Sequence, residues 1–265
     1  MAHDSDLNDL LGDLARDLPD ALRFDSSTAN VALPGAVDII PTDSLDLDLS
    51  ALFDSDLSYM AIGASDAIGV GATPLTNGYV FKIEDALDDR DTDVHLLDLG
   101  IPSANLNTIA DAAQLTLGLG AEPDLATVWV GANDIIHGVD PAVFEQQLDH
   151  LLHDLNETNA FIAIADIPDL TQLPRFREDP SPNVTSGRID AFNDAIHNQA
   201  AEHEAVLVRL SDQQVEDRFV SDADGFHPND LGHARIAELF LEAIEPNLAA
   251  GDGTPLSAAD VDLLG

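Results

Sequence analysis

The chain has no cysteine among its 265 residues and a single lysine, Lys82. The absence of cysteine excludes disulfide bonds and thiolate metal sites, and it removes the usual sequence indication of a redox compartment. Long apolar runs are also missing, and none approaches the roughly 20 residues that a membrane-spanning helix requires. We therefore expect no transmembrane segment.

Basic residues are scarce, with 10 Lys and Arg against 50 Asp and Glu, which gives a formal net charge of -40. A surface with this charge repels itself in dilute buffer, and dissolved salt screens the repulsion. The charge therefore favours a halophilic protein over an acidic protein of an ordinary cytoplasm or a calcium-binding protein. Nucleic acids and anionic lipid surfaces would be repelled, so neither is expected as a partner.

The first six residues lack the basic start and the apolar stretch of a secretory signal. They predict a cytoplasmic protein, or a secreted one if a leader has been removed or a C-terminal signal is used. No pattern in the sequence indicates an oligomeric state.

Three segments differ in their patterning. Residues 1–57 are predicted to be an acidic, partly ordered extension, and residues 249–265 a loose tail. Between them, residues 58–248 alternate short apolar runs with helical patterns, which is typical of a parallel α/β sheet in one domain. The predicted strands are 59–63, 94–99, 126–130, 160–165 and 205–210. One predicted helix presents an apolar face formed by Val143, Phe144, Leu148, Leu151, Leu152 and Leu155.

Ser65 follows the first predicted strand by two residues, between the small neighbours Ala64 and Ala67. Small residues permit a tight turn from strand to helix, and the start of that helix would add partial positive charge near a developing oxyanion. Functional loops gather at the carboxyl ends of parallel strands, which favours a nucleophilic Ser65. The alternative is a serine that only caps a helix.

The third predicted strand ends in Gly131-Ala132-Asn133-Asp134. The side-chain amide of Asn133 could stabilise the negative oxygen of a tetrahedral intermediate. The alternative for an isolated Asn-Asp pair is a turn at a strand end. Asp134 is expected to support the loop, with no part in the chemistry.

A carboxylate precedes a histidine by three positions in the segment 224–228, Asp-Gly-Phe-His-Pro. A loop of this length can fold Asp224 onto one ring nitrogen of His227, which leaves the other nitrogen to accept the proton of Ser65. An isolated Asp-x-x-His is ordinarily a surface loop. Pro228 and a helix predicted from Asn229 or Asp230 make this motif the most specific of the three.

In this order and spacing the motifs resemble those of the SGNH (GDSL) hydrolase family, over roughly residues 58–246. The first block of that family usually reads Gly-Asp-Ser-Leu, whereas residues 63–66 here read Gly-Ala-Ser-Asp. The resemblance implies a three-layer α/β/α, flavodoxin-like fold with a parallel five-stranded sheet. It also implies that Ser65, Asp224 and His227 are catalytic.

The same resemblance implies an oxyanion hole formed by the N–H groups of Ser65 and Ser103 and by the side chain of Asn133. Ser103 aligns with a glycine of the second family block. Every residue except proline offers a backbone N–H, so Ser103 can replace that glycine if its backbone conformation permits.

We therefore predict a serine ester hydrolase that acts through an acyl-enzyme on a small-molecule or lipid ester, without a cofactor or metal. The loop 169–176 would bring apolar residues toward the site, which favours an acyl chain over a sugar acetate. One alternative is an α/β-hydrolase that uses Ser65 with a different acid, such as Asp169 or Asp212. The other is a catalytically inactive binding module of SGNH fold.

Overall fold

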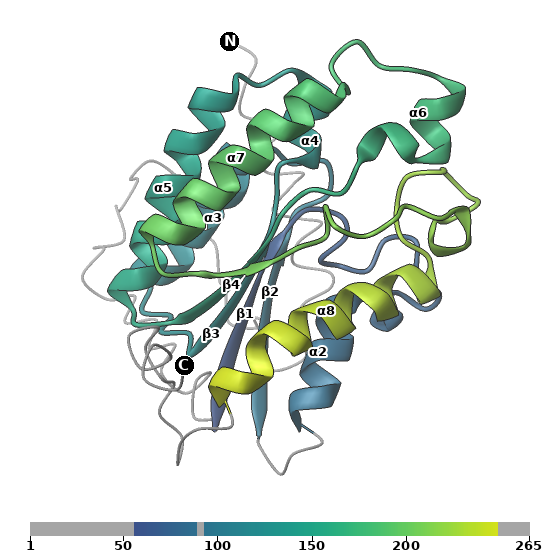
Figure 1. Ribbon diagram of the computed structural model, residues 1–265. Coiled ribbons are helices and arrows are strands. Elements are labelled where there is room, and N and C mark those ends of the chain that lie inside the picture. Colours follow the sequence, from purple (N-terminus) through teal and green to yellow (C-terminus); the bar gives the residue numbers. More distant parts are fainter. Residues whose placement is uncertain (1–55, 89–92, 249–265) are drawn as a thin grey trace, which may run out of the picture. The chain divides into compact units, whose positions relative to one another are not determined.

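The computed structural model of the protein describes residues 56–88 and 93–248 (Figure 1). The predicted tail and nearly all of the predicted N-terminal extension lie outside these residues. Within them, no helix is both long and apolar enough to cross a membrane.

A five-stranded, all-parallel sheet forms the centre of the described domain, with strand order β2-β1-β3-β4-β5. The strands are β1 (Leu57–Gly63), β2 (Val94–Gly100), β3 (Leu125–Trp129), β4 (Phe161–Ala165) and β5 (Val206–Val208). This confirms the predicted sheet. The fifth strand is shorter than predicted because the Leu210 N–H donates to the Val208 carbonyl, which turns the chain away from the sheet.

Helices cover both faces of the sheet, as the three-layer prediction requires (Figure 1). One face carries α3 (Leu106–Gly118), α5 (Pro141–Glu157) and α7 (Ser186–Glu202). The other carries α2 (Tyr79–Asp88) and α8 (Asp230–Leu248). Each layer of helices buries its own apolar cluster against the sheet. Two short helices, α4 (Ala132–His137) and α6 (Pro174–Glu178), follow the carboxyl ends of β3 and β4.

The apolar face of α5 is mostly as predicted, with one correction. Its buried side chains are Phe144, Leu148, Leu151, Leu152 and Leu155, but Val143 is 46% exposed. A helix turns by about 100° per residue, so Val143 lies beside the stripe that begins at Phe144 and is not part of it.

The segment after β1 differs from the prediction, because no helix begins at Ser65. Residues 64–73 form turns and bends, and the first helix of the described chain with α geometry is α2, at Tyr79. Gly69 and Gly71 adopt φ values of +81° and +99°, which interrupt a right-handed helix. A Cβ atom on Gly71 would lie 2.0 Å from the Pro228 carbonyl oxygen. The turn therefore packs directly against the loop that contains His227.

Candidate active site

Three predicted site residues form one chain of hydrogen bonds across the carboxyl edge of the sheet. Ser65 Oγ lies 2.8 Å from His227 Nε2, and His227 Nδ1 lies 2.5 Å from Asp224 Oδ2. Ser65 is buried, whereas the side chain of His227 is 15% exposed. In the tautomer that donates from Nδ1 to Asp224, Nε2 is free to accept the Ser65 proton. The arrangement can therefore activate the hydroxyl as a nucleophile.

The loop around Asp224 holds its carboxylate in the charged form. Asp224 Oδ1 accepts the N–H groups of Phe226 and His227, at 2.9 and 3.1 Å. Burial by itself would raise the pKa of Asp224, but the hydrogen bonds from the His227 side chain and from these two N–H groups outweigh it and lower the pKa. An ionised carboxylate in this place orients His227 and stabilises its protonated form.

The loop 220–228 is fixed by contacts at both of its ends. Ser221 N–H donates to the His227 carbonyl, and the Asn229 side chain donates to the carbonyls of Arg218 and Val220. Helix α8 begins at Asp230, as predicted, and Asp230 Oδ1 accepts the Thr73 N–H. The imidazole therefore sits on a loop whose backbone has little freedom to move.

Asn133 lies in the first turn of α4, directly after β3. Gly131 precedes this helix with a φ of +104°, and a Cβ atom there would meet Ile167 Cδ1 at 2.7 Å. Asn133 Nδ2 donates to the Ala104 carbonyl at 3.0 Å, which orients the amide toward the loop after β2. Asn133 and Ala104 both line a small cavity of about 20 Å³, next to Ala64. One amide hydrogen of Asn133 remains for a ligand.

Ser103 stands in the loop after β2, exposed and with a φ of +61°. This left-handed conformation is the one that favours glycine. Within the described residues, neither the Ser103 N–H nor the Ser65 N–H has a protein acceptor, so both are available to a ligand. No hydrogen bond of the described chain joins Ser103 or Asn133 to Ser65.

Asp134 has the supporting position that the sequence suggested. It is 1% exposed, and its two carboxylate oxygens accept the Leu106 N–H at 3.2 and 3.1 Å. Burial raises the pKa of Asp134, and the Leu106 N–H partly offsets that rise. Asp134 therefore ties α4 to the start of α3, and it holds Asn133 near the loop after β2.

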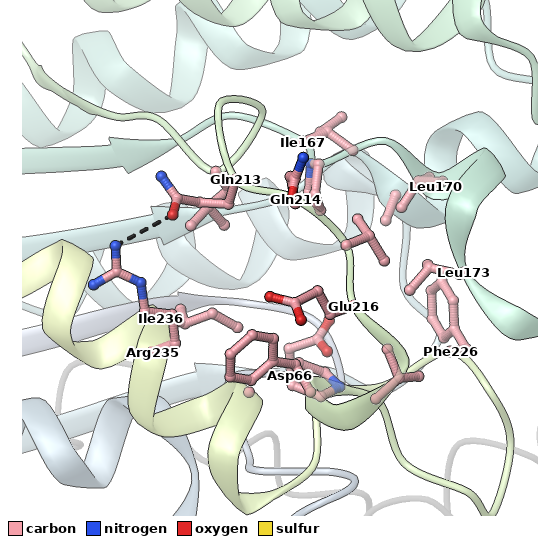
Figure 2. A pocket seen from close by; sticks show the side chains of 18 of the residues that line it. Asp66, Ile167, Leu170, Leu173, Gln213, Gln214, Glu216, Phe226, Arg235 and Ile236 are labelled. Carbon is pink, nitrogen blue, oxygen red and sulfur yellow. Dashed lines mark hydrogen bonds between the residues drawn. The ribbon is translucent and has the colours of Figure 1, made fainter.

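A larger cavity of about 280 Å³ lies beside this site (Figure 2). Its walls are mostly apolar and include Leu170 and Leu173, from the loop that was expected to approach the site. In Figure 2 these two residues lie on one side of the cavity, and Gln213 and Arg235 lie on the opposite side. Arg235 donates to the Gln213 side chain at 3.2 Å. The cavity can therefore hold an apolar group.

Asp66, next to the proposed nucleophile, lines both the large and the small cavity. Burial is the main cause that raises its pKa to about 6; the charge of Asp224 adds to the rise, and that of His227 opposes it. The residue keeps some exposed surface because it faces the cavities. The position of Asp66 on the walls of both cavities was not predicted from the sequence, although one signal was present: the family's first block usually has leucine where Asp66 stands.

His233 is a second site residue that sequence analysis missed. It is fully buried; its Nδ1 accepts the Tyr79 N–H at 3.2 Å, and its Nε2 donates to the Val70 carbonyl at 3.0 Å. Burial lowers its pKa, and the nearby charge of His227 acts in the same direction. The neutral ring ties α2 and α8 to the turn after Ser65. In the sequence, only the position of His233 on the apolar side of α8 could have indicated that it is a buried structural residue.

The structure does not support the alternative acids. Asp169 accepts hydrogen bonds from the Thr171 N–H and hydroxyl, at 3.0 and 2.5 Å, so it caps a turn. Among the described residues, neither Asp169 nor Asp212 bonds to His227, whose carboxylate partner is Asp224. This geometry separates the protein from an α/β-hydrolase with a remote acid.

A family model and one curated esterase are similar in sequence to this chain. The model of the GDSL-like lipase/acylhydrolase family matches residues 61–235. A multidomain esterase from Ruminococcus flavefaciens is 31% identical over 136 residues, or 49% of this chain. The chain spans 17% of the length of that curated relative.

Solved structures of similar fold align with most of the chain. A lipase/acylhydrolase from Enterococcus faecalis aligns with a TM-score of 0.60 and 17% identity, over 72% of this chain and 96% of that one. A family 3 carbohydrate esterase from Clostridium thermocellum aligns with a TM-score of 0.59 and 18% identity, over 73% and 98%. At these identities the likeness shows the fold. Because the family match covers most of the chain, the protein belongs to the GDSL-like lipase/acylhydrolase family.

Proposed function

We propose that the protein is a carboxylic ester hydrolase that acts through an acyl-enzyme on Ser65. The observation that carries the proposal is the hydrogen-bonded chain from Ser65 through His227 to Asp224, in a member of an acylhydrolase family. These three residues are called the proposed triad below. A chain of bonds with this geometry also argues against an inactive binding module, because such a module has no need to align a hydroxyl, an imidazole and a carboxylate.

The proposed triad hydrolyses an ester in two steps. Ser65 Oγ attacks the carbonyl carbon and gives its proton to His227 Nε2, which then protonates the departing alcohol. Water next attacks the acyl-enzyme, loses its proton to Nε2, and releases the carboxylic acid as Ser65 recovers its proton. Asp224 keeps the imidazole oriented and stabilises its positive charge in both steps.

The oxyanion of each tetrahedral intermediate is proposed to lie between three donors: the N–H groups of Ser65 and Ser103 and the Nδ2 of Asn133. Two observations support this: both N–H groups lack a protein acceptor in the described chain, and Asn133 borders the small cavity beside Ala64. Loss of one such donor costs about 10²–10³ in rate.

The proposed substrate is a small-molecule or lipid ester with an apolar acyl group. The apolar walls of the large cavity support this choice, since apolar pockets favour apolar ligands. A sugar acetate is the second candidate, because a structural neighbour is a family 3 carbohydrate esterase. An acetyl group would fill only the small cavity, whereas a longer chain would also use the large one.

A covalent probe tests the function without knowledge of the natural substrate. A fluorophosphonate should add one phosphonyl group to Ser65 and stop the hydrolysis of p-nitrophenyl acetate, and peptide mass spectrometry should place the adduct. The Ser65→Ala variant should take up no probe and hydrolyse no ester. Hydrolysis that survives in a folded Ser65→Ala variant would end the proposal.

We also propose that the enzyme works at high ionic strength. A net charge of -40 opposes compaction when the Debye length is roughly 30 Å, at 0.01 M salt, and much less when it is about 3 Å, at 1 M. Melting temperature and activity should rise steeply over this range, and equally in NaCl and KCl. A flat response, or a full response to millimolar calcium alone, would contradict the screening explanation.

A further inference from the structure

We propose that Asp66 is the specificity-determining residue of the ester site. The large cavity receives the acyl chain of the substrate, and the Asp66 carboxyl group makes acceptance of a long chain depend on whether that group is protonated. This inference rests on the proposed ester hydrolysis and names the substrate selection of the same site.

The position of Asp66 follows from the two cavities. Four residues line both of them and therefore stand between them: Asp66, Trp129, Ala132 and Phe226. Asp66 is the only ionisable residue among the four. It directly follows Ser65, and Phe226 directly precedes His227. An acyl chain that extends from a carbonyl carbon at Ser65 into the large cavity must pass this boundary.

The large cavity suits an aliphatic chain. Its 280 Å³ exceeds the volume of about 150 Å³ that holds a benzene molecule in a protein core. Most of its wall comes from apolar side chains, including Ile167, Leu210, Ile236 and Leu239. The Asp66 carboxyl group differs from these apolar side chains, so its place at the boundary of the cavity requires an explanation.

The other ionisable groups of the cavity wall already have partners. Arg218 bonds to Glu216 at 3.0 Å, and Arg235 bonds to Glu238 at 2.6 Å. Within the described residues, the Asp66 side chain has no hydrogen bond or ion pair with another residue. No arginine of the cavity therefore fixes the Asp66 carboxylate in its charged form.

The groups that act on Asp66 from a distance come from the His227 loop and from α2. The charge of His227 favours the ionised carboxylate, and that of Asp224 disfavours it. Tyr79 lies near enough for Asp66 to raise its pKa, and the buried phenol is neutral. Together with burial, these groups leave Asp66 able to change its charge near neutral pH, since its pKa is raised to about 6.

An acyl chain at the boundary removes the water that the Asp66 carboxylate needs. An aliphatic chain offers no hydrogen bond in exchange, so its presence favours the protonated acid. Long chains should therefore be accepted best at low pH and lose preference as pH rises through the pKa of Asp66. An acetyl group stays short of the boundary and should not show this loss.

The test is the ratio of kcat/KM for p-nitrophenyl octanoate to kcat/KM for p-nitrophenyl acetate, measured from pH 5 to pH 9 at constant salt. Any pH effect on the general base that both esters share cancels in the ratio. The bound octanoyl chain should raise the pKa of Asp66. In the wild type, the ratio should therefore fall as pH increases, by about tenfold in total for each pKa unit of that rise. In Asp66→Asn and in Asp66→Leu it should be high and independent of pH.

Glu216→Gln is the matched control, since Glu216 lines the same cavity but is paired with Arg218. Its ratio should keep the pH dependence of the wild type. A flat ratio in the wild type, or an unchanged pH dependence in a folded Asp66→Asn or Asp66→Leu variant, would overturn the inference while ester hydrolysis stands. Failure to hydrolyse either ester would instead refute the proposed function, and the inference with it.

Discussion

The described chain contains two groups made of one serine, one histidine and one aspartate, and they differ in the order of their hydrogen bonds. In the proposed triad the histidine is in the middle. In the second group the aspartate is in the middle: Asp166 accepts the Ser211 hydroxyl at 2.6 Å, the Ser211 N–H at 2.7 Å and His197 Nε2 at 3.0 Å. Asp166 is fully buried at the end of β4.

The order decides what each group can do. The Ser211 hydroxyl meets a carboxylate, which is a far weaker base than an imidazole. The second group therefore fastens the segment after β5 and helix α7 to the end of β4, and it cannot activate its serine. The same three residue types can form the proposed triad or a structural brace, according to which side chain stands between the other two.

The two serines provide the largest contrast. Ser65→Ala should lower kcat on p-nitrophenyl acetate by a factor on the order of 10⁶, because the nucleophile is lost. Ser211→Ala should keep the activity but lower the free energy of unfolding by roughly 1.5–3 kcal/mol, since a hydrogen bond to a buried carboxylate disappears. Kinetics and urea denaturation of both variants test this. A large kinetic loss in Ser211→Ala would break the comparison.

The two aspartates should separate in the same way, with a smaller kinetic effect. Asp224→Asn should lower kcat about 10⁴-fold with little change in KM, because His227 loses its orienting charge while substrate contacts remain. Asp166→Asn should act mainly on stability, at a cost of roughly 1–3 kcal/mol, since an amide cannot accept all three donors. If the kinetic losses were reversed, the acid would be Asp166.

A third aspartate, Asp66, sharpens the comparison because it has no hydrogen-bonded partner in the described chain. Its folded pKa, raised to about 6 from an ordinary 3.8, means that the folded state holds the proton more tightly. The resulting stabilisation is complete below the ordinary pKa and is lost as pH rises through 6. At pH 8 Asp66→Asn should therefore be more stable than the wild type by roughly 1–3 kcal/mol.

This difference should shrink toward zero at pH 4, where the wild-type carboxyl group also carries a proton in the folded state. Urea denaturation of both proteins at pH 4 and at pH 8, at constant salt, measures this difference in the free energy of unfolding. A variant that is less stable than the wild type at pH 8 would show that the carboxylate has a favourable partner.

A third serine gives the smallest expected effect. Ser103 holds a φ of +61°, which costs a residue with a side chain about 1 kcal/mol. Ser103→Gly should raise the free energy of unfolding by up to that amount and keep kcat, because its N–H remains available. A clear loss of activity in this variant would show that the Ser103 hydroxyl, and not its N–H, serves the site.

Sequence patterns located the strands and the motifs because both depend on neighbours along the chain. Ser65, Asn133 and the segment 224–228 each follow a strand or precede a helix, so their meeting at one edge of the sheet was predictable. The turn after Ser65 was not, since Gly69 and Gly71 have positive φ values where the backbone packs closely against Leu75 and Pro228, and no local pattern records those contacts.

The large cavity could not be predicted for a related reason. Its wall combines Asp66, Trp129, Phe226 and Leu239, which belong to segments far apart in the sequence. A cavity is defined by what tertiary packing leaves unfilled, and no local pattern records this. The leucine-to-aspartate departure in the first block was visible, but its meaning required the position of the cavity.

Ser65 and His227 are separated by 162 positions, yet their side chains share one hydrogen bond. During synthesis, β1 and its serine leave the ribosome long before the loop that supplies the imidazole. The hydroxyl cannot be activated until the last strand has joined the sheet and α8 has docked. Enzymatic turnover therefore indicates that folding is complete. In a refolding experiment, activity should return when the contact between Ser65 and His227 forms, and this should be later than the return of the helical circular dichroism signal.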